Sequence, residues 1–506
     1  MIFTQIRDIV LNYKWIFLAV FLTRLAMLVY VFPDTERIYN GDSSLYEQYA
    51  LSLNETGEYL APGYATIDSD PFADMIRPPG YPSVMWIIYA VFGSNWGPWM
   101  MAFLSGLMSL CTLTLLILFI HLFGLHHARV ALWIFVVDPV WIMYSKEILT
   151  EPFFVPLILA GLYFGIIALS RLTDQNLIGD GELTIHQYGI QQLMVLSGLF
   201  FGLATLFKPI TLYAPLAGFL LILILFLIHI FRHRKQINNP RVMVIDADTQ
   251  TEREWLIQNS KIWLTAAILF LLTAQSLIFT WQYRNYLQHN TIAFTSIQSE
   301  NMMTGHAAFV MAQVEGLTHL EAQQLIRTRF NEVHPEQGRY TFTELSAAKS
   351  EIASEILTDN KMVYLGSIFR GMAITLFDPG RLVTSRTFAE STSTEIGLTN
   401  SIAKDGVVGT LKKLFDEQPG MSLFLLVHLI YLVLIFGLSV VGVYYLCKKY
   451  PVPAIVLGCF FLYLWVLGGP SGYARFRMYL SPFMILFITF LPYSWYHTMH
   501  KKIKIN

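Results

Sequence analysis

Ten long apolar runs constrain the fold of this chain more than any other feature of its sequence. A helix that crosses a bilayer needs about 20 predominantly apolar residues, and each run comes close to that length. Only 14% of the residues are charged, compared with about 25% in soluble domains. We therefore predict an all-α polytopic membrane protein with about ten transmembrane helices, at 15–33, 97–122, 129–145, 152–170, 191–207, 209–231, 261–282, 421–446, 452–468 and 478–496.

The basic residues predict the orientation of these spans, because cytoplasmic loops carry an excess of Lys and Arg. On this rule the inner loops hold Arg129, Arg171, a basic cluster after residue 231, the pair Lys448 and Lys449, and the lysines near the C-terminus. The first apolar run lacks a small-residue cleavage site after it, which indicates a retained span. Both termini are then expected in the cytoplasm, with the loop after the first span outside a cytoplasmic (inner) membrane.

The polar segments divide the chain into three parts. We expect a transmembrane catalytic module at 1–283 that includes a first outer loop at 34–96, an external helical insert at 284–420, and C-terminal transmembrane helices at 421–506. Helical spacing within the insert recurs at 316–332 and 343–357. Two short apolar runs, 83–92 and 362–377, are expected to lie at the outer interface, the second because it carries Arg370.

The first outer loop is rich in acidic residues, and Asp42 is the most constrained of them. It follows Gly41 and precedes two serines, where a loop can turn into a helix with Leu45, Tyr49 and Leu53 on its apolar face. An aspartate at this position is well suited to cap the helix. Capping and a catalytic role are compatible, so both interpretations stay open.

Ionisable side chains gather at the predicted outer ends of the spans. A single charge at a helix end is usually a snorkelling or paired residue. Charge at membrane depth is costly, however, and agreement of so many ends on one face indicates a polar site. The residues are Asp42, Arg77, Lys146, Glu147, Glu151, Lys208, Arg284, Arg475 and Arg477.

Acids and bases together beside lipid suit a reaction on an anionic, lipid-linked substrate. Guanidinium groups bind phosphate oxygens bidentately and can neutralise a leaving phosphate. We expect Arg475 and Arg477 to hold the phosphate, with contributions from Lys208, Arg77 and Arg284. A nearby carboxylate can accept the proton of an attacking hydroxyl or amine, and Asp42 is the candidate.

Other patterns argue against further site types. Three cysteines in or beside apolar runs and histidines without i,i+4 partners give no metal motif. No cofactor is predicted, and a site built from His306 and a loop acid is the metal alternative left open. The balance of 34 basic and 35 acidic residues gives no reason to expect nucleic-acid binding.

Glu151 also has a structural interpretation, because it lies at the predicted start of a helix, where the helix dipole favours a carboxylate.

A set of short motifs resembles the integral-membrane glycosyltransferases of the GT-C class. The nearest relatives would be the bacterial protein O-mannosyltransferase and lipid A aminoarabinose transferase superfamily. No single motif is specific, but their order is similar to that of the class over residues 15–300 and 420–490. The motifs are GDSSLYEQYA, RPPGYP, SKEILTEP, FKP, W-x-x-RNY and a late R-x-R before a proline.

The resemblance implies a sugar donor on a polyprenyl phosphate, such as undecaprenyl phosphate, and an active site on the periplasmic or extracytoplasmic face. It also implies inversion at the anomeric carbon, with a loop aspartate as base. Asp42 matches that aspartate, 77–82 the closing motif of the loop, and Glu151 the acid of the TEP motif. The chain departs from the resemblance in having Gly41 before Asp42 where the protein mannosyltransferases have an Asp-Glu pair. This difference weakens the expectation of a protein acceptor and leaves Glu47 or Glu151 as second acid.

The function predicted is transfer of a sugar from a polyprenyl-phosphate donor to a lipid, glycan or protein acceptor. Asp42 and Glu151 are the expected catalytic residues. Two other classes remain as alternatives: a flippase or transporter of lipid-linked sugars, and an O-antigen polymerase or ligase. Contacts with the acceptor or the sugar are expected from Tyr46, Glu47, Tyr81, Lys146, Glu147 and Asn285.

Overall fold

All the regular structure in the part of the chain that the structure describes is helical. The computed structural model describes residues 11–61, 72–173, 175, 177, 188–237, 249–388, 409, 412, 416 and 419–492. Within these residues no strand occurs, and several helices are long and apolar. The prediction of an all-α polytopic membrane protein is confirmed.

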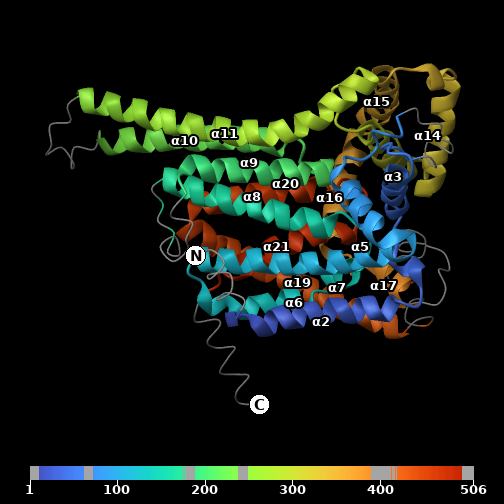
Figure 1. Cartoon of the computed structure of the whole chain (residues 1–506), viewed down its shortest axis with the longest axis horizontal. Helices are drawn as coiled ribbons and strands as arrows, with labels where there is room; N and C mark the ends of the chain where they lie inside the picture. Colours follow the sequence, from blue (N-terminus) through green and yellow to red (C-terminus); the bar gives the residue numbers. More distant parts are fainter. Residues whose placement is uncertain are drawn as a thin grey trace, which may run out of the picture.

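Among the residues that the structure describes, seven helices are long and apolar enough to cross a membrane. They run roughly along one direction in Figure 1, and neighbours in sequence pack together, as in α8 with α9 and α10 with α11. These seven helices are α2 (Lys14–Val31), α5 (Gly80–Leu122), α8 (Glu151–Leu172), α9 (Ile190–Phe207), α10 (Ala214–Ile237, preceded by the short η5, Pro209–Thr211), α11 (Thr249–His289) and α19 (Pro419–Lys449).

The other three predicted spans correspond to shorter helices. The run 129–145 is broken into α6 (Leu132–Val137) and α7 (Pro139–Tyr144), because proline cannot continue a helix and Asp138 caps the second piece. The last two runs form α20 (Pro451–Val466) and α21 (Arg477–Ile488). The expected positions of the apolar segments are therefore observed, but three of them are shorter than a full span.

The run at 83–92 forms a separate helical piece at the start of α5. Gly93 ends this piece with a φ of 71°, a left-handed conformation that only glycine adopts without strain. The helix then resumes toward Leu122. The expected location of the 83–92 piece at the membrane interface stays a prediction.

The centre of the bundle is formed by helices that are apolar on every side. In α21 each residue from Arg477 to Ile488 is buried, and α8 is buried along most of its length. Such all-round hydrophobicity is typical of helices enclosed by other helices. Close packing of α9 on α11 depends on Gly198 and Gly202, where a Cβ atom would overlap the backbone of Phe270 and Ala274.

A group of shorter helices covers one end of the bundle, where Figure 1 labels α3, α14, α15 and α16. The helices expected at 316–332 and 343–357 are α14 (His319–Val333) and α15 (Phe342–Asp359), and each begins with a Thr and Glu capping box. The remaining elements at this end are α3 (Ser43–Glu55), η1 (Thr35–Ile38), α12 (Ile297–Glu300), η6 (Asn301–Ala307), α13 (Ala308–Glu315), η7 (Gln337–Arg339), α16 (Lys361–Phe377), α17 (Arg381–Phe388) and η8 (Ala474–Phe476).

The first loop and the 284–420 segment share a hydrophobic core at this end. Phe72 and Met75 of the loop belong to the same buried cluster as Ile326 of α14 and Ile352 of α15. The segment thus packs directly on the loop that carries Asp42. The boundaries expected at 283 and 420 stay predictions, and α11 continues past the first of them to His289.

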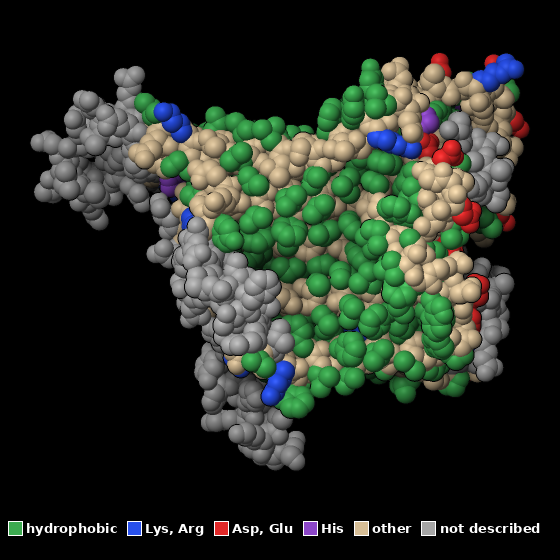
Figure 2. Space-filling view, viewed as in Figure 1, with side chains coloured by type: hydrophobic (Ala, Val, Ile, Leu, Met, Phe, Trp, Pro, Cys, Tyr) green, Lys and Arg blue, Asp and Glu red, His purple; other side chains and the backbone are tan. Residues whose placement is uncertain are grey.

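Charge and hydrophobicity are separated on the surface. Figure 2 shows hydrophobic side chains over the middle of the bundle and acidic side chains at the end that carries α3, α14 and α15. This separation agrees with a membrane-embedded body and one acidic, water-facing end. Several expectations on topology fall outside the described residues: both chain termini, Arg241, the C-terminal lysines and the end of the last span.

Candidate active site

The end of the bundle brings together five of the charged residues predicted from the sequence. Asp42 precedes α3, Arg77 lies in the loop before α5, and Glu151 is the first residue of α8. Lys208 follows α9, and Arg475 lies in η8 before α21. We call Asp42, Arg77, Glu151, Lys208 and Arg475 the charged cluster.

Asp42 is held by two arginines. Arg77 Nη2 lies 2.6 Å from Asp42 Oδ1, and Arg475 Nη1 lies 2.9 Å from Oδ2. The aspartate occupies the N-cap position of α3, yet its side chain makes no capping hydrogen bond. Its side chain therefore serves the ion pairs rather than the helix end.

Glu151 provides the second anion of the cluster. Its Oε1 lies 2.6 Å from Lys208 Nζ and 3.0 Å from Arg475 Nε, and its side chain is 1% exposed. Thr150 donates a hydrogen bond to its other oxygen. Arg475 consequently binds both carboxylates, one through each side of its guanidinium group.

The cluster differs in exposure from one side to the other. The side chain of Asp42 is 26% exposed and that of Arg475 is 19% exposed, whereas Glu151 is enclosed. A small ligand can therefore reach Asp42 and Arg475 but not Glu151. Three cations face two carboxylates, so the cluster has one positive charge in excess and favours an additional anion.

These contacts set the protonation of Asp42. Burial alone would raise the pKa of the Asp42 carboxyl, but Arg77 and Arg475 outweigh burial and hold the pKa well below its usual range. Asp42 is accordingly ionised throughout the physiological pH range. In this state it is a hydrogen-bond acceptor of low basicity.

A second group of polar residues lies beside the cluster. Glu147 is fully buried and lies 3.1 Å from Arg386 of α17 and 3.7 Å from Lys146. Asn40 donates a hydrogen bond to Glu147 at 2.9 Å and accepts one from Arg475 at 3.4 Å. Asn40 thus connects the two groups. Both Lys146 and Glu147 are enclosed in this structure, and their expected contact with an acceptor or a sugar stays a prediction.

Arg477 and Arg284 lie apart from the charged cluster. Arg477 donates hydrogen bonds to the carbonyl oxygens of Thr375, Leu376 and Asp378, where it caps the end of α16. Arg284 lies 2.7 Å from Asp74 and donates to the side chain of Asn285. Neither of these arginines makes a described contact with Asp42, so phosphate binding by them stays a prediction.

The expected sugar-binding residues occupy supporting positions. Tyr46 lies beneath the Arg77 guanidinium, 5.4 Å from its carbon to the ring centre, and Tyr81 packs edge-on against Tyr46. Glu47 accepts hydrogen bonds from the hydroxyls of Tyr39 and Tyr89, both at 2.7 Å. The described contacts of these side chains are with the protein, and their role toward a sugar stays a prediction.

Sequence reasoning did not identify Asn40 or Arg386 as parts of the site. Asn40 directly precedes Gly41 and Asp42, so its place in the motif was the available signal. Arg386 lies in the least recognisable segment and reaches Glu147 only through the tertiary fold. Within the described residues, no group of three or more His, Cys, Asp or Glu side chains is arranged to hold a metal ion.

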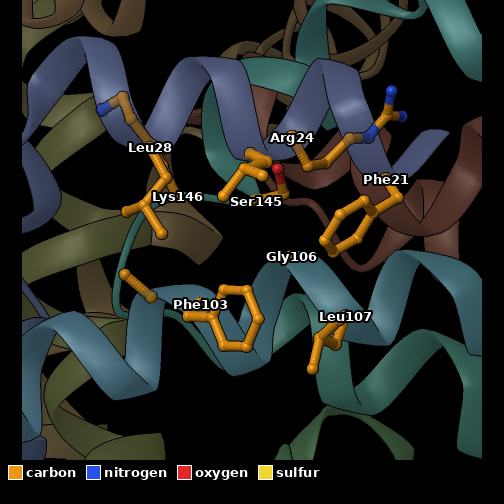
Figure 3. Close-up of a pocket in the computed structure, with 10 residues that line it drawn as sticks. Phe21, Arg24, Leu28, Phe103, Gly106, Leu107, Ser145 and Lys146 are labelled. Carbon is orange, nitrogen blue, oxygen red and sulfur yellow. The ribbon is translucent and has the colours of Figure 1, made fainter. Parts of the chain in front are cut away.

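A small pocket between α2 and α5 is too small for substrate. Figure 3 shows Phe21 and Leu28 of α2 opposite Phe103 and Leu107 of α5. Its volume of about 10 Å³ is close to the minimum for a single water molecule. This pocket can hold no more than about one water molecule.

Asp42→Asn should destabilise the protein by about 1.5–3 kcal/mol near neutral pH, the contribution of hydrogen bonds to a charged group. Because the folded pKa of Asp42 is depressed, its contribution is present above the unfolded carboxyl pKa of about 3.9 and is lost as the pH falls further. Thermal midpoints of wild type and variant in detergent should differ by a constant amount from about pH 8 to 5 and converge only below about pH 4. Convergence already near neutral pH would contradict the assigned ion pairs.

No family model and no curated protein matches this chain. Its structure is similar to that of the archaeal oligosaccharyltransferase AglB from Archaeoglobus fulgidus, which was solved with an inhibitory peptide and a dolichol-phosphate. The TM-score is 0.47 at 13% sequence identity, over 97% of this chain and 52% of that one. The chain thus spans about half the length of that protein, and at this degree of similarity its donor, acceptor and activity are left open.

Proposed function

We propose that this protein transfers a sugar from a polyprenyl-phosphate donor to a lipid, glycan or protein acceptor at the outer face of the cytoplasmic membrane. The observation that carries the proposal is the charged cluster, in which three cations and two carboxylates meet at the water-facing end of a membrane bundle. Its excess positive charge suits an anionic donor. Its partly exposed aspartate suits deprotonation of an acceptor.

The phosphate of the donor would bind to the exposed side of Arg475 and Arg77. Guanidinium groups pair with phosphate oxygens in a fixed, bidentate geometry and remain charged at all relevant pH values. Lys208, whose side chain is 14% exposed, contacts the same Glu151 oxygen as Arg475 and adds a third positive charge. These charges stabilise the leaving phosphate as the glycosidic bond breaks.

Binding of the phosphate would also change the basicity of Asp42. In the unliganded protein both of its oxygens are occupied by arginines. A phosphate that draws on the same guanidinium groups weakens these pairs, and the pKa of Asp42 then rises toward its ordinary value. The base thus becomes effective only when the donor is present.

In the reaction, an acceptor hydroxyl or amine gives its proton to the Asp42 carboxylate. The freed electron pair of the acceptor forms the new bond to the anomeric carbon. The bond from that carbon to the phosphate oxygen breaks, and its electron pair leaves with polyprenyl phosphate. Attack from the side opposite the phosphate inverts the anomeric centre. Glu151 holds Arg475 and Lys208 in place and exchanges no proton.

A large apolar cavity offers a place for the prenyl chain. It has a volume of about 390 Å³ and is lined by residues of α8, α9, α10, α11 and α20, among them Gly165, Phe201 and Cys459. Tyr463 lines the cavity and donates a hydrogen bond to Ile210, two residues after Lys208. This link joins the cavity to the segment that carries the cluster.

Asp42→Asn should abolish release of polyprenyl phosphate while donor binding persists, because the amide cannot accept the acceptor's proton. Loss of a general base lowers kcat by about 10²–10⁴-fold. Release is measured with purified protein in nanodiscs and a panel of polyprenyl-phosphate sugars. The matched control is Asp34→Asn, which alters a half-buried aspartate paired with Arg37 in the same loop and should retain activity. Equal donor consumption by wild type and Asp42→Asn would refute the assigned base.

Cys459→Trp should impair use of long-chain donors by filling the apolar cavity. We expect KM for an eleven-isoprenoid donor to rise about tenfold, whereas KM for a two-isoprenoid donor stays within about twofold of wild type. Cys111→Trp is the control, since Cys111 is also exposed but lies on α5, away from the cavity. An equal rise for both chain lengths would argue against this location of the chain.

A further inference from the structure

A second large pocket lies between the membrane helices and the external helices, away from the charged cluster. It has a volume of about 490 Å³. One wall consists of the start of α10 and the last turns of α11, and the other of α12, η6 and α15. A ligand in this pocket would therefore lie beside both the membrane and the external cap.

The lining of this pocket is polar but carries no charge among its described residues. It offers amide groups, hydroxyl groups and aromatic rings, as in Gln275, Gln298, Ser346, Ser350 and Tyr213. Amides and hydroxyls both donate and accept hydrogen bonds, and so does each hydroxyl of a sugar. An ionic ligand would lose its hydration here without gaining a countercharge.

Several of these polar groups have no partner in the described part of the chain. The side chains of Gln275, Thr295, Gln298, Ser346 and Ser350 make no hydrogen bond to another described residue. Gln275 is the most informative, because it lies inside the apolar stretch of α11. A polar side chain at membrane depth is costly unless it is satisfied or serves a function.

The charged side chains next to the pocket pair with one another. Glu300 follows the lining residue Ser299, and Lys349 precedes the lining residue Ser350. Lys349 Nζ lies 2.9 Å from Glu300, which also pairs with Arg327 at 3.2 Å. None of these three side chains is among the described residues that line the pocket, so a ligand inside it meets an uncharged lining.

The wall of the pocket is fixed and is connected to the charged cluster. Trp281 and Asn285 both donate hydrogen bonds to the carbonyl of Phe294, which lines the pocket. Trp281 packs edge-on against Tyr59, whose hydroxyl donates to the carbonyl of Arg77. Asn285 is thus a positioning residue for this pocket.

We propose that this pocket binds an uncharged carbohydrate, namely the part of the acceptor that lies beyond its reacting group. This inference rests on the proposed function, because the carbohydrate is taken to be the acceptor of the transferred sugar. The unpartnered amides and hydroxyls would bind sugar hydroxyls, and Tyr213 and Phe342 would pack on the apolar faces of the rings. The carbohydrate could be carried on a lipid or be a soluble glycan.

The test is binding of neutral trisaccharides of hexose and N-acetylhexosamine to the full-length protein in nanodiscs, without any donor. Each probe is used free, as a dodecyl glycoside, and with one sugar replaced by a uronic acid. We expect Ser350→Trp to weaken binding at least tenfold, whereas Ser354→Trp, one turn further along α15 and outside the pocket, changes it less than twofold. Gln275→Leu, which adds no bulk, should weaken binding about two- to tenfold.

The outcomes separate this inference from the proposed function. Tighter binding of the dodecyl glycoside, relative to protein-free nanodiscs, would support a glycolipid, and equal binding of the free sugar a soluble glycan. No binding of any neutral probe, equal effects of the two tryptophan variants, or equal binding of the uronic acid probe would overturn the inference. Asp42→Asn should leave saccharide binding within twofold. Donor turnover without saccharide binding refutes only the pocket, and saccharide binding without turnover of any donor refutes only the proposed reaction.

Discussion

The guanidinium group of Arg475 holds together the end of the molecule that carries α3, α8 and η8 at the charged cluster. It joins Asp42 of the first loop to Glu151 at the start of α8, across more than 400 residues of sequence in the first case. Buried or half-buried charges are tolerated only when they are paired, and removal of one partner leaves the others uncompensated. Loop, α8 and η8 must therefore assemble together. The same pairing leaves a net positive charge beside Asp42, which is the basis of the proposed chemistry.

Two pockets complement this cluster in different ways. The apolar cavity among α8, α9, α10, α11 and α20 suits a prenyl chain, whereas the uncharged polar pocket beneath α15 suits a carbohydrate. Both are connected to the cluster by short paths, one through Ile210 and the other through Tyr59. Donor lipid and acceptor sugar would then approach the charged groups from separate sides. This arrangement keeps the apolar and the hydrated parts of the substrates in matching surroundings.

Much of this site could be predicted from the sequence because its signals are local. Apolar length locates the spans, and a charge at a span end indicates the face on which it lies. The direction in which a side chain points cannot be predicted from its neighbours in sequence. Arg475 and Arg477 are two residues apart, yet Arg475 binds carboxylates and Arg477 caps α16. Proline chemistry explains the break at 138–139, but the contact of Arg386 with Glu147 depends on the tertiary fold. The uncharged polar pocket could not be predicted from the sequence either, because glutamines and serines form no distinctive sequence motif.

The central claim is that the charged cluster binds the phosphate of a polyprenyl carrier. The most direct measurement compares the affinity of the protein in nanodiscs for polyprenyl phosphate and for the uncharged polyprenol, in wild type and in Arg475→Met. Arg370→Met, an exposed arginine on α16, is the control. The account predicts a preference for the phosphate of at least about tenfold that Arg475→Met removes and Arg370→Met retains. Equal affinity of wild type for the two lipids, or a preference that survives Arg475→Met, would contradict it.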